Sequence, residues 1–564
     1  MILGDAQERV ALATLLDFVE GWFRHAQNAA DAESTRAALI AAGQLEQGFA
    51  DAGEAIAEPV TDAAAEALIA CWRCRPVEEI RDALDRGLAA LALIVPARFE
   101  TGSLLIKAPE GFAFYALFPE QYAEAAFSWA ASRSHSKSRV LVVGIRSIGT
   151  TLSAVVKAAL TSIGWNARRC TVRPEGGIYD RKITFAAEIG NRADWALVAD
   201  EGPGNTGVSM AAAVFALEKA GIPRSRIGLF PSHAGSPGRE SPDSVKACWK
   251  SVPSVIGHPP DIVGKLTAAT ERITGGVVIE TQDWSAGAWR GHVFERRQQW
   301  PAVCAMLERI KHRCLLNDKS ALVWKFSGFS GVHSQNANAE AKRLKTTHPW
   351  TPEPVAICDG FIATPWIRGT RMVQATPAFA SHMGRYLAAA CSQELNYEEV
   401  VAAHERITPL IEANLSRWLG QQAARRATEL WKRTRAVPSP LCVDPRQPLH
   451  DWIETGPDQW IKTDSTGHLC DHTLAGRQPI EWGLAAACNA CGPRETPALL
   501  SAFHANIGWT ISKGRLVAYQ IAQAAFRLGE LELALTTGWP DNLEEQQRIQ
   551  REARMIIANI KRLL

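Results

Sequence analysis

The pattern of apolar and polar positions changes character near residue 139. Before it, apolar residues recur at helical spacing, as in 9–23 and 77–95, and predict a helical N-terminal region. After it, short continuous apolar runs predict buried strands at 139–147, 166–174, 193–204 and 226–233. Helical segments separate these runs, so the region predicts a parallel sheet with crossover helices.

The rest of the chain predicts a mixed α+β region. Residues 109–122 indicate an aromatic strand or turn before a helix, and 245–310 have no clear pattern. From about residue 311 we expect a hairpin with an Asn-Asp turn, a helix at 336–348 and a strand pair at 359–369. A helical stretch (375–435), a loop-rich segment (436–480) and a final helical stretch follow.

Length and these changes of pattern predict a multidomain α/β chain. At about 150 residues per domain, a chain of 564 residues is expected to contain three or four domains. We expect a helical region at 1–104, an α/β domain at 105–244, a connecting region at 245–310 and a C-terminal domain at 311–564.

Composition and charge narrow the class of protein. The net charge of +2 does not indicate nucleic acid or an anionic membrane as a partner. The sequence has no apolar run of about 18 residues and no signal-like N-terminus, so we expect a cytoplasmic protein with reduced cysteines. The pairs Cys71/Cys74 and Cys488/Cys491 fit ordinary helical cysteines better than a metal or redox site.

The segment LVADEGPGNTGVSM (197–210) joins a buried strand to an acidic pair and a glycine-rich loop. Ligands of open parallel sheets bind at the carboxyl ends of the strands. A glycine-rich turn at a helix N-terminus presents backbone N–H groups that bind phosphate. The carboxylates of Asp200 and Glu201 are acceptors for vicinal hydroxyls, so the pattern points to a sugar phosphate.

This segment resembles the phosphoribosyl pyrophosphate (PRPP) motif of the type I phosphoribosyltransferases, although Asn-Thr-Gly and Pro203 mark a divergent branch. The resemblance covers about 105–240. It implies that Asp200 and Glu201 hold the ribose hydroxyls near Mg²⁺. The loop that binds the 5′-phosphate would comprise Gly202, Gly204, Asn205, Thr206, Gly207 and Ser209.

Two further segments carry the same resemblance. VGIRSIGTTLSAVV (143–156) resembles the pyrophosphate loop, and RPEGGIYDRK (173–182) resembles the flexible loop over the active site. The implied pyrophosphate contacts are Gly144, Arg146, Ser147, Gly149, Thr150 and Arg173. Arg181 and Lys182 would neutralise charge on the departing pyrophosphate.

Each of these residues also has an alternative, purely structural interpretation. Asp200 also suits a helix cap, Arg146 a structural role, and the basic loop residues a solvated surface. Phe114 or Tyr115 could stack on a flat acceptor, although such residues more often lie in a core.

The C-terminal half is similar to kinase-like phosphotransferases of the aminoglycoside phosphotransferase type. LVWKFSG contains a strand lysine, Lys325, and Glu340 follows on a predicted helix at the spacing of the ion pair that positions ATP phosphates. The resemblance implies a hinge at 359–369, a base at Asp444 and a metal-binding carboxylate at Asp464. No glycine-rich loop precedes Lys325, and the usual catalytic-loop and metal-loop patterns are absent.

The sequence therefore predicts an Mg²⁺-dependent phosphoribosyltransferase that uses PRPP and a small-molecule acceptor, coupled to an ATP-dependent phosphotransferase. A homodimer is the expected assembly, by resemblance. Alternatives are a non-catalytic PRPP or nucleotide sensor and a nucleotide-acting stress or defence effector. The cluster HLCDH (468–472) is conceivable as a metal site but is more typical of a structural loop.

Overall fold

The computed structural model describes residues 7–95, 102–133, 138–185, 193–204, 206–395, 397–434, 437–468, 478–539 and 541–564. The chain divides into two compact units. The first, here the sheet unit, comprises Gln7–Ile262 with Gly328–Asn336. The second, here the cleft unit, comprises Val263–Ser327 with Ala337–Leu564. The four-domain division expected from the sequence stays a prediction.

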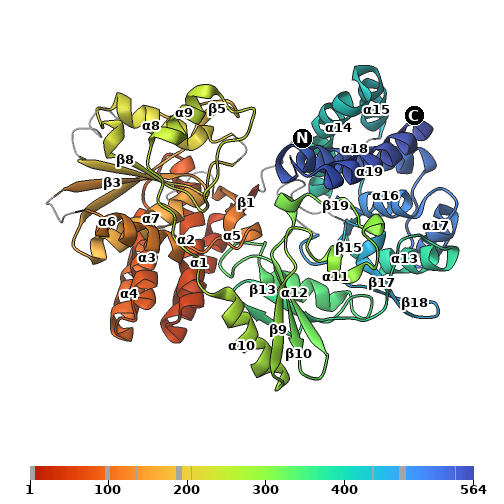
Figure 1. Cartoon of the computed structure of the whole chain (residues 1–564), viewed down its shortest axis with the longest axis horizontal. Coiled ribbons are helices and arrows are strands. Elements are labelled where there is room, and N and C mark those ends of the chain that lie inside the picture. Colours follow the sequence, from red (N-terminus) through yellow and green to blue (C-terminus); the bar gives the residue numbers. More distant parts are fainter. Residues whose placement is uncertain are drawn as a thin grey trace. The chain divides into compact units, whose positions relative to one another are not determined.

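A four-stranded parallel sheet lies at the centre of the sheet unit (Figure 1). Its order is β4 (Asn166–Val172), β3 (Arg139–Ile145), β7 (Trp195–Ala199) and β8 (Ile227–Phe230). All neighbouring pairs are parallel, which confirms the strands and crossovers predicted from the apolar runs.

Helices cover both faces of this sheet. On one face, α8 (Val208–Lys219) and α9 (Asp243–Ser251) bury their apolar residues against β3, β7 and β8. On the other, α7 (Ile148–Ser162) packs with α6 (Glu120–Ala131). Continuous aliphatic strands such as β3 need this double cover because both of their faces are apolar.

The N-terminal helices belong to the same unit as the sheet. They are α1 (Leu12–Ala29), α2 (Ala32–Asp51), α3 (Glu58–Trp72) and α4 (Val77–Ala92), with β1 (Gln7–Ala11) paired to β2 (Ser103–Lys107). Helix α3 packs on α7, and α2 carries Glu46 to Arg169 of β4 in a buried ion pair of 2.7 Å. Breaking such a pair on one side costs about 3–5 kcal/mol, so it ties the helices to the sheet.

A five-stranded antiparallel sheet forms one part of the cleft unit. Its order is β12 (Ala356–Cys358), β13 (Phe361–Pro365), β11 (Ala321–Phe326), β10 (Lys311–Leu316) and β9 (Val278–Asp283). The β10–β11 hairpin and helix α12 (Ala337–Thr346) confirm two sequence predictions. Trp324 is fully buried on one face of β11 and donates to Thr270 of α10 (Ile262–Thr274) at 2.8 Å.

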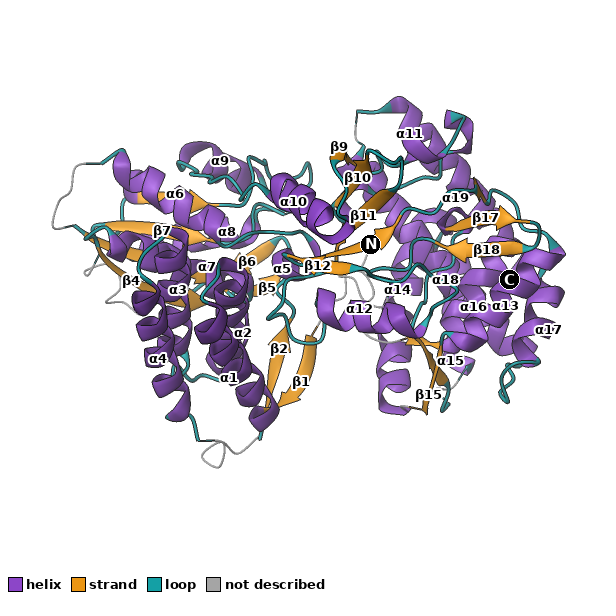
Figure 2. Ribbon diagram, turned by 90° about the horizontal axis from the view of Figure 1, so that it is seen from below, coloured by secondary structure: helices purple, strands orange, loops and turns teal. Residues whose placement is uncertain are grey.

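The other part of the cleft unit is helical. One apolar core joins its helices, with the buried rings of Trp431, Trp452 and Trp482 among its largest members. The helices are α13 (Pro377–Ala389), α14 (Tyr397–Leu419), α15 (Gln421–Arg433), α16 (Ile480–Cys491), α17 (Thr496–His504), α18 (Lys513–Leu533) and α19 (Leu543–Leu563) (Figure 2).

Three segments differ from the sequence predictions. The expected aromatic strand or turn at 109–122 contains a short helix, α5 (Glu110–Phe114), whose Phe112 and Phe114 are buried in the core. The expected loop at 173–182 contains a small hairpin, β5 (Glu175–Gly177) with β6 (Asp180–Lys182). The expected loop-rich segment 436–480 contains the hairpin of β17 (Trp452–Gly456) and β18 (Gln459–Lys462). Short strands of mixed polarity give no clear period, which is why the pattern did not reveal them.

The structure also shows where the cysteine pairs and part of the HLCDH cluster lie. In the described ranges no helix is long and apolar enough to span a membrane. Cys74 is exposed on the surface, whereas Cys488 and Cys491 are buried in α16. Of the cluster HLCDH, only His468 lies in the described residues.

Candidate functional site

Two lysines of the cleft unit converge on one aspartate. Lys311 of β10 and Lys325 of β11 are direct cross-strand partners, so their side chains project from the same face of the sheet. Lys325 Nζ lies 2.5 Å from Asp464 Oδ1, and Lys311 Nζ lies 3.1 Å from Asp464 Oδ2. Burial raises the pKa of Asp464, but attraction to the two lysines outweighs burial and holds the pKa well below its usual range.

A second aspartate, Asp451, lies beside this cluster without a cation of its own. It directly precedes β17 and is 5% exposed. Its Oδ2 has no hydrogen-bond partner among the described residues. Burial and the charge of Asp464 raise the pKa of Asp451 to about 8. No sequence motif singles out Asp451, because its place beside Asp464 follows from the pairing of β17 with β18.

Asp444, the expected base, is enclosed. Both of its oxygens are in use: Oδ2 accepts from Lys462 at 2.6 Å and Tyr386 at 2.5 Å, and Oδ1 faces His468 Nδ1 at 3.0 Å. Burial raises the pKa of Asp444, but Lys462 and His468 lower it further than burial raises it. The structure therefore gives Asp444 the position of an internal anchor for Lys462 and His468.

His468 connects this anchor to the two aspartates. Its Nε2 lies 3.8 Å from Asp451 Oδ2 and 3.9 Å from Asp464 Oδ1. Burial lowers the pKa of His468 to about 4, so the ring is neutral near pH 7. Among the described residues no group of three or more His, Cys, Asp or Glu side chains has the geometry of a metal site.

Glu340 does not make the expected ion pair with Lys325. Its carboxylate binds Arg343 one helical turn away, at 2.7 and 2.8 Å, and accepts from the Gly467 N–H at 2.6 Å. Arg343 also donates to the Ser465 carbonyl. The ion pair of Glu340 and Arg343 thus forms within α12. Glu340 also holds the loop after Asp464 through Gly467, whereas Lys325 binds Asp464 itself.

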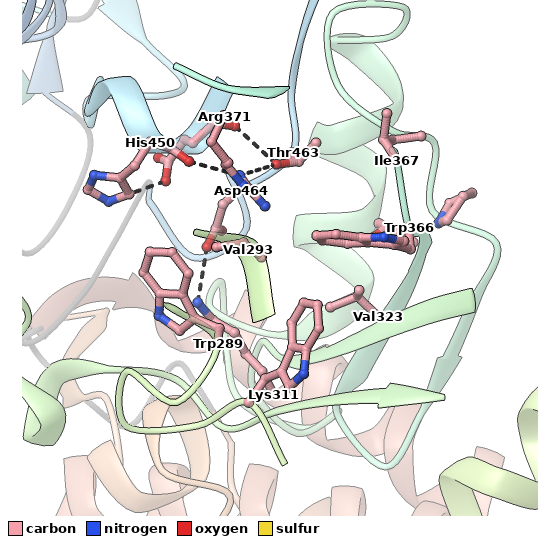
Figure 3. Close-up of a pocket in the computed structure, with 14 residues that line it drawn as sticks. Trp289, Val293, Lys311, Val323, Trp366, Ile367, Arg371, His450, Thr463 and Asp464 are labelled. Carbon is pink, nitrogen blue, oxygen red and sulfur yellow. Dashed lines mark hydrogen bonds and ion pairs between the residues drawn. The ribbon is translucent and has the colours of Figure 1, made fainter. Parts of the chain in front are cut away.

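Two cavities meet at the aspartates. A narrow one of about 50 Å³ is walled by Trp284, Trp289 and Trp366, and by the 364–367 segment that was expected to be a hinge (Figure 3). A wide one of about 700 Å³ extends from Lys311 and Lys325 to helices α16, α18 and α19. Lys311, His450, Asp451 and Asp464 line both, so the charged cluster stands where the two cavities join.

The sheet unit has an acidic site at the carboxyl end of β7. Asp200 follows the strand directly, and Tyr122 donates to its carbonyl oxygen at 2.6 Å. Burial raises the pKa of Asp200 to about 7, opposed by attraction to Arg181 and Arg173. Burial, Glu110 and Asp200 raise the pKa of Glu201 well above its usual range.

The glycine-rich loop leads from this pair into α8. Gly204 and Gly207 have φ values of 53° and 64°, which favour glycine. A Cβ at Gly207 would lie 2.7 Å from Pro237 and Trp249. Thr206 Oγ1 accepts from the Val208 N–H at 3.4 Å, and Ser209 is half-buried in the first turn of α8. Asn205 lies outside the described residues.

The loop after β3 lies against the end of β7. Gly144 of β3 is the register partner of Ala199, and a Cβ at Gly149 would lie only 2.7 Å from the Ala199 carbonyl oxygen. Ser147 precedes α7, and Thr150 is fully buried in its first turn. The fold thus brings the expected pyrophosphate loop beside Asp200 and Glu201. The Arg146–Ser147 peptide bond is cis.

The basic residues of this site have different environments. Arg146 and Arg173 both bind Asp51 at the end of α2, and Arg146 also donates to the Ala50 carbonyl and to Thr171. Burial raises the pKa of Asp51, but Arg173 and Arg146 lower it below its usual value. Lys182 lies on the exposed β5–β6 hairpin, 3.7 Å from Asp180. No pattern in the sequence singles out Asp51.

Known proteins of similar structure match about half of the chain. No family model and no curated protein matches the sequence. The structure resembles a type I macrolide 2′-phosphotransferase with 13% identity and a TM-score of 0.34, over 52% of this chain and 98% of that one. It also resembles macrolide 2′-phosphotransferase MphH from Brachybacterium faecium, with 14% identity and a TM-score of 0.34, over 53% of this chain and 98% of that one.

A structure of the aminoglycoside phosphotransferase APH(2″)-IIIa, titled as a complex with GDP and kanamycin, gives a similar result. Its identity is 11% and its TM-score 0.34, over 53% of this chain and 99% of that one. All three likenesses extend over about half of this chain.

Proposed function

We propose that the cleft unit transfers a phosphoryl group from a purine nucleoside triphosphate to a small molecule. The observation that supports this most is the convergence of Lys311 and Lys325 on Asp464 where two cavities meet. Phosphoryl transfer needs cations that position the phosphates and neutralise the charge that develops on them. Lys311 and Lys325 lie on adjacent strands with side chains only 10% and 12% exposed, and would supply such cations from a rigid sheet.

The two aspartates fit a divalent cation. Mg²⁺ binds to one or two carboxylates and completes its shell with phosphate oxygens and water. Asp464 and Asp451 offer two carboxylates, and the unpartnered Oδ2 of Asp451 is a buried acceptor that a cation would satisfy. The ion would supply charge neutralisation at the transferring phosphoryl group. Lys311 and Lys325 would then turn from Asp464 toward the phosphates.

The narrow cavity borders the proposed site of the nucleotide base. At about 50 Å³ it is smaller than a purine ring, so the base would enter only as the surrounding side chains move apart. The indole rings of Trp284, Trp289 and Trp366 border it together with Val323. Flat aromatic walls favour stacking of a planar ring. Its position next to Lys311 and Asp464 would let the base enter there while the phosphates extend to the lysines (Figure 3).

Calorimetric titration with ATP and Mg²⁺ tests this function. Asp464→Asn and Lys325→Ala should each weaken binding at least tenfold, because each removes one charge of the cluster. Asp318→Asn, in the exposed β10–β11 turn, is the matched control and should bind as the parent does. Unchanged ATP affinity in Lys325→Ala would contradict the proposal.

A second candidate function belongs to the sheet unit: Mg²⁺-dependent binding of PRPP, with transfer of its ribosyl phosphate to an acceptor. The supporting observation is that the loops after β3 and β7 lie together at the carboxyl edge of a parallel sheet, with Gly149 against Ala199 and the acidic pair beside them. Asp200 and Glu201 would accept from the ribose hydroxyls, and residues 202–209 would bind the 5′-phosphate. Sensing of PRPP without turnover is the alternative for this site.

Titration with PRPP and Mg²⁺ tests the second candidate. The double variant Asp200→Asn/Glu201→Gln should lose binding, whereas Asp194→Asn, just before the amino end of β7, should retain it. Because the pKa of Asp200 is about 7, affinity should rise as pH increases through that value and the carboxylate ionises. Equal PRPP affinity in the double variant and the parent would remove the ribose assignment.

A further inference from the structure

Gln447 lines the wide cavity and has an unsatisfied acceptor. It lies between Asp444 and Asp451 in sequence and is 2% exposed. Its Nε2 donates to the Asp444 carbonyl oxygen at 2.8 Å, while its Oε1 has no partner among the described residues. The reversed amide would place Oε1 against that carbonyl oxygen, so the contact fixes the orientation. A buried amide oxygen without a donor costs about 1–3 kcal/mol, which a hydroxyl of a bound molecule would recover.

The charges around the wide cavity do not favour a cationic ligand. Glu530 is paired with Arg446 at 2.7 Å and with Arg527 at 3.0 Å, and Glu552 is paired with Arg527 at 2.8 Å. The acidic side chains of this wall are thus already neutralised by arginines. With Lys311 and Lys325 at the other end, the cavity offers no excess of negative charge to an amine.

The far wall carries amides as well. Asn489 donates to Gln523 Oε1 at 2.9 Å, and Asn559 donates to Asn489 Oδ1 at 3.2 Å. All three line the cavity. Amide groups both donate and accept, which matches the dual character of hydroxyl groups.

From the unsatisfied Gln447 oxygen and the neutralised wall, we infer that the phosphoryl acceptor is an uncharged or anionic compound bearing several hydroxyls, such as a sugar or sugar phosphate. Gln447 is its positioning residue. This inference rests on the proposed phosphotransferase function and names its substrate class.

The proposed transfer forms one bond to the γ-phosphorus and breaks one. The acceptor's hydroxyl oxygen bonds to the γ-phosphorus, and the bond from that phosphorus to the β–γ bridging oxygen breaks. The nucleoside diphosphate leaves with the electron pair, and the hydroxyl proton passes to water. Gln447 takes no proton; its Oε1 holds the hydroxyl during approach.

The test measures ADP release by the full chain with ATP and Mg²⁺, in the presence of ribose, glucose 6-phosphate or kanamycin, a cationic amino sugar. We expect at least one of the two hydroxyl compounds to stimulate release more than kanamycin does. Gln447→Met should raise the KM for that compound about tenfold and leave the KM for ATP unchanged, a split that a merely structural role would not produce. The exposed Gln459→Met is the control.

Thermal unfolding of each variant checks the fold. If Gln447→Met lowers the midpoint, Gln447→Asn, which keeps the amide but withdraws it by one methylene, should show the same KM split. Preference for kanamycin, no stimulation by either hydroxyl compound, or an unchanged acceptor KM in both Gln447 variants would overturn the inference. Failure to bind ATP would instead overturn the proposed function, and the inference with it.

Discussion

Asp451 and Asp464 lie in the same cavity, yet their pKa values move in opposite directions. Asp451 is buried and the side chain of Asp464 is 25% exposed, and burial alone raises the pKa of a carboxyl group. Asp464 has two lysines within 3.1 Å and stays ionised. Asp451 faces the charge of Asp464 and has a pKa of about 8. The arrangement keeps a proton on Asp451 until a cation replaces it.

This difference predicts a pH dependence of Mg²⁺ binding. Below about pH 8 the ion must displace the proton of Asp451, so affinity should rise with pH and level off above that value. Asp451→Asn should weaken binding and remove the slope. Titration of Mg²⁺ with ATP present between pH 6 and 9 measures both. A flat profile in the parent protein would contradict the role of Asp451.

The same proton affects stability. The folded pKa of Asp451 lies above its ordinary value of 3.8, so between those pH values the folded state holds a proton that the unfolded state has lost. The contribution of this group to the free energy of unfolding therefore falls as pH rises from about 4 to 8. Asp451→Asn should reduce that fall, as measured by urea unfolding at several pH values.

At the scale of elements, the sheet unit depends on the close approach of α7 to the end of β7. Gly149 begins this approach, since any Cβ there would meet the Ala199 carbonyl oxygen at 2.7 Å and Gly144 at 3.1 Å. The contact joins the loop after β3 to the strand that carries Asp200. A side chain at this position would separate the two loops that form the proposed PRPP site.

Gly149→Ala should therefore destabilise the protein by at least about 1 kcal/mol and weaken PRPP binding. Gly21→Ala is the matched control: it lies in α1 with no atom within 4 Å of its added Cβ. That change should stabilise the protein by about 0.5–1 kcal/mol, because alanine favours a helix over glycine. Chemical denaturation measures both. Equal stability of the two variants would show that the approach is not tight.

At the scale of the whole molecule, the chain forms two compact units with separate cores and separate candidate sites. The sheet unit contains the acidic pair, and the cleft unit contains the lysine–aspartate cluster. A ligand that binds one folded unit stabilises that unit by mass action, by about 2.7 kcal/mol at a hundredfold excess over Kd. The two sites can therefore be assigned without knowledge of the reaction.

Calorimetric unfolding should show two transitions. ATP with Mg²⁺ should raise the midpoint of one, and PRPP with Mg²⁺ the midpoint of the other. Asp464→Asn should abolish the first shift and leave the second, and the Asp200/Glu201 double variant should do the reverse. Loss of both shifts in either variant would contradict the independence of the two sites.

The amino-acid pattern by itself determined the alternating strands and helices of the sheet unit, and with them the edge at which Gly149, Asp200 and the glycine-rich loop meet. Parallel strands joined by crossover helices place every strand-end loop on one side, so local order was enough. Lys325 and Asp464 were singled out only by the resemblance to kinase-like phosphotransferases, and the structure places their charged groups 2.5 Å apart.

Only the tertiary structure decided how these residues are used. The contacts from Asp464 to Lys325 and Lys311 join residues 139 and 153 positions apart, and Asp51 reaches Arg146 across 95. No local period encodes such distant pairings, because they depend on how whole elements pack. The same holds for Asp444. It was expected to act as a base, and in the structure both of its carboxylate oxygens contact Tyr386, Lys462 or His468.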